Sequence, residues 1–174
     1  MAIFIKEFLK RPHERNKKRV AMLATFVAPV FAAEKISATF IPSAVSTTGG
    51  TVNLTPSGIR HVNGAVRTAT ATLIIGTVVY TGSVRVDLDY IVNPIKGTTT
   101  QHYHKMTMTF PVQTGLAQEG TFEGVLTWTA ELANPIATLA GHAVLQGAGA
   151  FEGQTLKLSN MHTGGPFTGW LLTH

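Results

Sequence analysis

The feature that most constrains this 174-residue chain is the strict alternation of apolar and polar side chains in several short runs. In Val84–Val92 the apolar positions alternate with Arg85, Asp87 and Asp89. In Thr121–Leu132 one face carries Phe122, Gly124, Leu126, Trp128, Ala130 and Leu132. Because successive strand residues point to opposite faces, these runs predict strands with one buried face. That pattern is typical of an antiparallel sheet wrapped around a single core.

Thr, Val, Gly and Ala dominate the chain after residue 33, and no segment there keeps a helical period. Candidate strands are 36–41, 51–54, 59–62, 66–79, 83–92, 102–110, 121–132, 138–148, 155–158 and 167–172. Turn residues separate them, including a predicted turn at 43–50. Asn63-Gly64, between two β-prone runs, predicts a hairpin turn. Many regularly spaced strands indicate a sandwich or barrel, and we expect an all-β antiparallel barrel of roughly eight strands.

The first nineteen residues carry most of the net charge. They hold seven Lys or Arg against Glu7 and Glu14, a net of +5, whereas the remaining seven basic and seven acidic residues cancel. The apolar segment 20–32 follows and ends in Val30-Phe31-Ala32. It is too short to cross a bilayer as a helix of about 20 residues. We expect 1–32 to be a secretory signal cleaved near Ala32, and 33–174 to be a single secreted or cell-surface barrel domain. A basic helical arm or an uncleaved anchor is the alternative.

The composition of the body limits its partners and its means of stabilisation. It has no cysteine, so packing and hydrogen bonding must replace the disulfides of many secreted domains. Its near-neutral charge argues against nucleic-acid binding. Membrane association is expected only through the leader, and no cofactor is expected.

A glycine-rich segment carries a resemblance to a known superfamily. Gly147-Ala-Gly149-Ala-Phe151-Glu-Gly153 resembles the Gly-x-Gly-x-Phe-x-Gly segment of the allene oxide cyclase-like and dirigent-like barrels, including their small secreted prokaryotic members. The segments 121–124, 139–142 and 167–172 fall where such barrels keep their later strands. The resemblance implies a small barrel whose glycines serve bulges and tight coiling. The superfamily includes a cyclase that shapes a bound lipid epoxide and dirigent proteins that orient radicals, but its catalytic positions have no identifiable counterparts here.

His102 and His104 are the best candidates for chemistry. On an uninterrupted strand they share a face, and that face continues as Met106, Met108 and Phe110. Imidazole suits zinc, copper or nickel, and His142 is a candidate third ligand. The alternative is that these histidines are half-buried residues near a loop.

Tyr90, Met106 and Trp128 are also predicted to face inward. They belong either to the core or, with His102 and His104, to the wall of a ligand cavity. Asp87 and Asp89 are expected on the outer face beside Arg85. No nucleophile-elbow or zinc-protease motif occurs.

We therefore expect a non-catalytic binder of a small apolar ligand. The alternatives are an isomerase or cyclase that uses the same cavity, and a structural protein whose barrel is filled by its own side chains.

Overall fold

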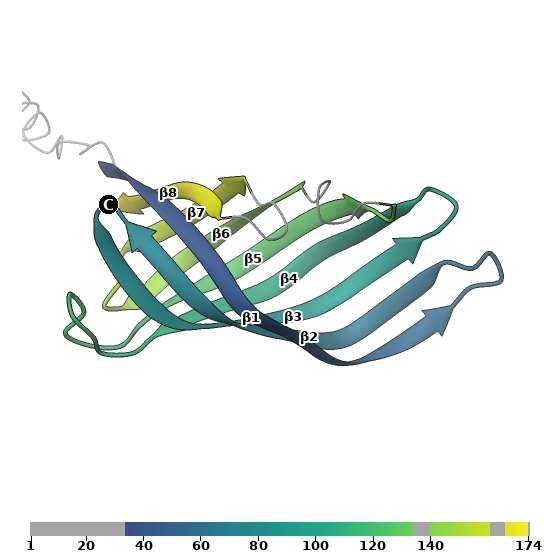
Figure 1. Cartoon of the computed structure of the whole chain (residues 1–174), viewed down its shortest axis with the longest axis horizontal. Helices are drawn as coiled ribbons and strands as arrows, with labels where there is room; N and C mark the ends of the chain where they lie inside the picture. The colour runs from purple at the N-terminus through teal and green to yellow at the C-terminus, as the bar shows by residue number, and fades with distance from the viewer. Residues whose placement is uncertain (1–33, 134–139, 161–165, 174) are drawn as a thin grey trace, which may run out of the picture. The chain divides into compact units, whose positions relative to one another are not determined.

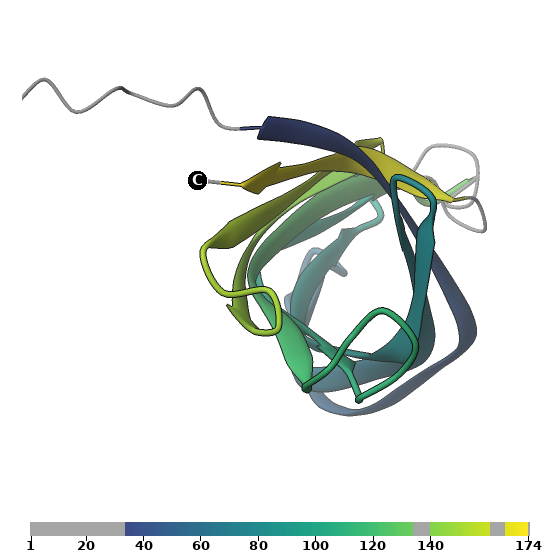
Figure 2. The same cartoon turned by 90° about the vertical axis from the view of Figure 1, so that its left-hand side faces the viewer.

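The chain forms an eight-stranded antiparallel barrel (Figures 1 and 2). A computed structural model describes residues 34–133, 140–160 and 166–173, with the side chains of these except 101–103 and 160. The strands are β1 (Glu34–Leu54), β2 (Arg60–Ile75), β3 (Val78–Asn93), β4 (Thr98–Phe110), β5 (Gly120–Glu131), β6 (Ala140–Gly149), β7 (Gln154–Asn160) and β8 (Phe167–Thr173). The all-β antiparallel barrel predicted from the sequence is confirmed. The leader lies outside the described residues, so its signal and helical character stay predictions.

The ring of strands is closed over only part of its length. β1 pairs with β8 from Glu34 to Phe40, and beyond Phe40 it pairs with β2 alone. Pro42 lies two residues beyond this point, and an edge is where a sheet tolerates a residue without an N–H. The β1–β2 and β3–β4 hairpins continue past β8 (Figure 1). We call the part around Glu34–Phe40 the closed half, and strand segments 41–54, 60–67, 88–93, 98–103 and 127–131 the open half.

Aromatic side chains fill the end of the closed half. The ring of Phe151, in the β6–β7 turn, stacks on Phe122 with centroids 4.4 Å apart and meets Phe110 and Tyr80 edge-on at 5.8 and 5.5 Å. Such aromatic pairs add to the free energy gained by burial.

Two glycines make room for this arrangement. A Cβ on Gly147 would collide with the backbone of Phe151, and one on Gly120 would collide with its ring. The glycine-rich segment therefore lets the β6–β7 turn fold the Phe151 ring into the end of the barrel.

The alternation that predicted the buried faces is confirmed. Val84, Val86 and Leu88 are buried on β3, and Phe122, Leu126 and Ala130 are buried on β5. Most of their outward neighbours are polar and include the ion pair between Arg85 and Asp87, whereas Val125 is apolar and 46% exposed. In the part of the chain that the structure describes, no helix is long and apolar enough to cross a membrane.

The predicted strand boundaries were wrong at three places. The turn expected at 43–50 is part of strand β1, and the hairpin expected at Asn63-Gly64 is a bulge within β2. The real hairpin between β2 and β3 turns at Gly76 and Thr77, inside the single strand predicted over 66–79.

Glycines explain the first two errors. Gly49, Gly50 and Gly64 have φ angles of 70°, 97° and 71°. Gly49 and Gly50 lie on β1 beside the segment of β2 that contains Gly64. These conformations favour glycine in a bulge as much as in a turn, so both strands bend here without ending.

Candidate ligand site in the open half of the barrel

The inner wall changes from fully buried to partly accessible toward the open half. In the closed half, inward residues such as Met108 and Phe122 are 0% exposed. In the open half, Tyr90 and Trp128 also point inward and pack against the core, but each is only half-buried. Both are cross-strand partners of Gln101 on β4, so they lie on either side of it in one row. The open half therefore presents an aromatic inner surface that solvent reaches.

Two neighbours define the surroundings of these aromatic rings. Gly141 on β6 is the partner of Trp128, and a Cβ there would collide with the Trp128 side chain. The wall beside the indole therefore carries no side chain at this position. Met106, 2% exposed, lies deeper on β4. Three of the predicted ligand residues, Tyr90, Met106 and Trp128, are thus placed on the inner face.

His104 is buried at the boundary between the two halves. Its Nδ1 accepts a hydrogen bond of 2.8 Å from the backbone N–H of Asp89, and the Asp89 carboxylate accepts one of 2.7 Å from the N–H of Gly64. These two bonds connect β4, β3 and β2 where the β2 bulge interrupts the ladder. Because Nδ1 accepts this hydrogen bond, its lone pair is already used. His104 therefore stabilises the junction between the two halves.

The predicted relation between His102 and His104 depended on uninterrupted alternation. The register of β4 against β5 shifts between Gln101 and His104, where two residues of β4 face one of β5. This bulge breaks the alternation and makes Gln101 the partner of Trp128. The side chain of His102 lies outside the described residues, so its part in a ligand site stays a prediction.

His142 lies on the outer face of the barrel. It is exposed, and its ring is 3.1 Å from the hydroxyl of Thr127. His104 points inward in the row of Leu126 and Ala143, so the structure does not bring His104 and His142 together. Among the residues that the structure describes, no three His, Cys, Asp or Glu are grouped to hold a metal ion. His142 was the expected third ligand, but it lies one residue away from inward Ala143 and therefore on the opposite face of β6.

Arg67 is an inward residue that the sequence analysis missed. It pairs with buried Val86 and with Thr47, and its Nε donates a 3.1 Å hydrogen bond to the Thr47 hydroxyl. Desolvation by burial lowers the pKa of Arg67, and the opposing effect of the neighbouring Tyr90 offsets only part of this decrease. The sequence contains the pattern that predicts this position, because the alternation that places Thr68 on the outer face places Arg67 on the inner face.

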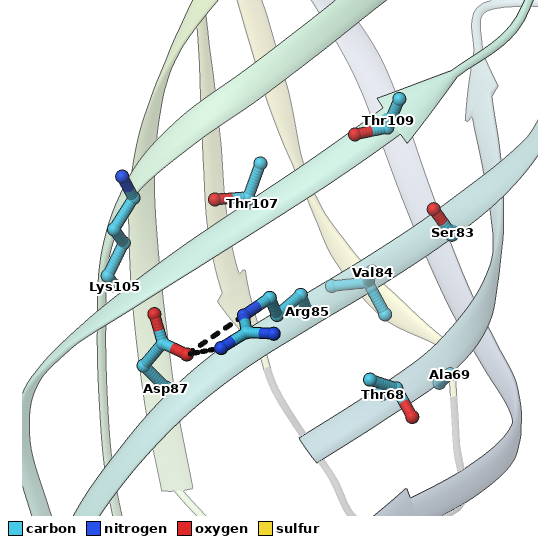
Figure 3. A pocket seen from close by; sticks show the side chains of 9 residues that line it. All are labelled: Thr68, Ala69, Ser83, Val84, Arg85, Asp87, Lys105, Thr107 and Thr109. Carbon is cyan, nitrogen blue, oxygen red and sulfur yellow. Dashed lines mark hydrogen bonds and ion pairs between the residues drawn. The ribbon is translucent and has the colours of Figure 1, made fainter. Parts of the chain in front are cut away.

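A separate hollow of about 430 Å³ lies on β2–β4, and Figure 3 shows hydroxyl and charged side chains along it. Its charges are used in pairs: Arg85 meets Asp87 at 2.8 Å, and Lys105 meets Glu123 at 2.8 Å. The predicted outward position of Asp87 and Asp89 is confirmed. Exposed pairs of this kind contribute little to stability, and the hollow is an open surface rather than part of the interior.

No family model, curated protein or solved structure matches the chain. A barrel by itself supports many functions, so any function must be argued from the inner wall of the open half.

Proposed function

We propose that the protein is exported and that its open half binds a small apolar ligand without transforming it. The observation that carries the proposal is the change in burial along the inner wall, from 0% exposed at Phe122 to half-buried at Trp128 on the same strand. Apolar surface that faces inward but remains wet gains free energy when a ligand covers it, at about 25 cal/mol per Å². Ligand sites are commonly apolar walls with a few polar groups.

The polar groups of this wall support binding rather than catalysis. General acid–base chemistry needs a group that can exchange a proton with the ligand. The inward histidine His104 uses its Nδ1 on Asp89, and Asp87, Asp89 and Glu123 belong to the outer face. The side-chain-filled barrel, the structural alternative, describes the closed half well. The half-buried aromatics of the open half favour a binder.

The export part of the proposal is supported by the leader. The basic segment, the short apolar stretch and Val30-Phe31-Ala32 have the order of a secretory signal. The first described strand, β1, begins at Glu34, two residues after Ala32. Cleavage at that point leaves every described strand intact. Intact-mass measurement on protein from the native host should give Ala33 as the first residue, outside the cytoplasm. A cytosolic species that begins at Met1 or Ala2 would contradict export.

The two tryptophans allow a matched test of ligand binding. Trp128 is on the inner wall, whereas Trp170 is 41% exposed on the outside, with Lys35 4.1 Å from its ring. The neutral apolar dye N-phenyl-1-naphthylamine should bind the wild type saturably, with a rise in its fluorescence. Trp128→Ser should weaken that binding about tenfold, the effect of one well-buried aromatic contact, and Trp170→Ser should leave it unchanged. Absence of saturable binding, or equal loss in both variants, would refute the binder.

A further inference from the structure

Arg67 stands out on the inner wall because it is a cation among apolar and hydroxyl neighbours. The inward positions of β2 beside it, Ala65 and Ala69, carry small apolar side chains. Its partner across the ladder on β3 is Val86, which is 6% exposed. Charged residues are seldom placed inward unless something pairs with them.

The donors of Arg67 are only partly used. Nε bonds to Thr47, and within the described residues the two terminal nitrogens have neither a carboxylate partner nor another acceptor. The nearby acids are occupied on the outer face: Asp87 pairs with Arg85, and Asp89 accepts from Gly64. Arginine stays protonated at any physiological pH, so this position keeps a positive charge and terminal N–H groups that can donate hydrogen bonds to a ligand.

We propose that the ligand of the open half is an organic anion: an apolar body that carries one oxyanion group, which Arg67 binds. The inference rests on the proposed function and adds the ligand's charge. A carboxylate or sulfonate offers two oxygens to the paired donors of a guanidinium. The apolar body would lie against the half-buried rings of Tyr90 and Trp128. The lowered pKa of Arg67 agrees, because a partly desolvated cation gains most from an incoming anion.

A purely structural role for Arg67 makes a different prediction. One bond from Nε to the exposed Thr47 hydroxyl connects β1 to β2, and that role is indifferent to the charge of a ligand. The two roles are therefore separated by ligands that share a tail and differ in their head group.

The test is displacement of N-phenyl-1-naphthylamine from the full-length protein at pH 7.5 by octanoate, octane-1-sulfonate, octan-1-ol and octylammonium. We expect both anions to displace the dye at concentrations about tenfold lower than the alcohol, the effect of a charge-assisted hydrogen bond. Octylammonium should be the weakest. Arg67→Gln should remove the difference between anion and alcohol, and saturable binding of the dye to this variant shows that it is folded. Arg67→Lys should keep part of the difference.

Arg85→Gln is the matched control, because Arg85 is an outward arginine paired with Asp87. It should retain the full preference for anions. Equal displacement by octanoate and octan-1-ol in the wild type would overturn the anion inference and leave the binder standing. A preference that survives in Arg67→Gln, or that Arg85→Gln also removes, would overturn it too, as would failure of every octyl compound to displace a bound dye. Failure of the dye to bind at all would refute both proposals.

Discussion

Phe122 and Trp128 occupy equivalent inward positions on strand β5, yet their surroundings differ. Phe122 is stacked on Phe151 and fully enclosed, whereas Trp128 lies where β1 has lost β8 as a partner and is half-buried. Burial in the closed half stabilises the fold, so its side chains are fixed by packing. The open half keeps similar side chains in a position where a ligand can cover them. Whether an inward aromatic side chain is enclosed or accessible therefore depends on strand closure rather than on residue type.

Truncating these two aromatics is the strongest test of the comparison. Phe122→Ala should lower the free energy of unfolding by about 3–5 kcal/mol, because it leaves a cavity in an enclosed cluster. Trp128→Ala should cost about 2 kcal/mol or less, since much of its surface is already wet. Chemical denaturation of both variants measures this difference. Equal losses of stability would mean that the open half is packed like the closed half.

A second pair tests the register of β5 at the boundary between the halves. Leu126 is 5% exposed and points inward, whereas Thr127 points outward to His142. Leu126→Ala should cost about 2–5 kcal/mol, and Thr127→Ala should cost less than about 1 kcal/mol. If the two denaturation midpoints shift alike, the inward face of this strand has been assigned wrongly.

The third pair addresses the junction itself and has the smallest expected effect. Asp89 and Asp87 are neighbours on the outer face of β3, but only Asp89 accepts the N–H of bulged Gly64. Asp89→Ala should cost about 1 kcal/mol through the lost bond to the backbone. Asp87→Ala should cost less than about 0.5 kcal/mol, because its partner Arg85 is exposed. Thermal melts of both variants decide this. A larger loss for Asp87→Ala would contradict the role given to Asp89.

Much of the candidate site follows from counting along the strands. Alternation placed Tyr90, Met106 and Trp128 on the inner face, and the same count places Arg67 there. It could not place His142 with His104, because these residues come from different strands. On β6 both alternating sets, Ala143 with Leu145 and His142 with Val144, contain apolar residues, so the pattern by itself does not say which set is buried. A bulge in β4 likewise interrupts the alternation from which His102 and His104 were predicted to share a face.

The fold class and the buried side of each strand can be predicted from the sequence, because side-chain alternation is a local property with a period of two. Only tertiary contacts determine whether Asn63-Gly64 forms a hairpin turn or a bulge within a strand. Both need a glycine at positive φ, and the bulge persists because Asp89 and the β1 ladder hold the neighbouring backbone. Tertiary structure also decided how deeply each inward residue is buried. That depth depends on where the pairing of β1 with β8 stops, at Phe40 and Phe167. These two segments lie more than a hundred residues apart in the sequence.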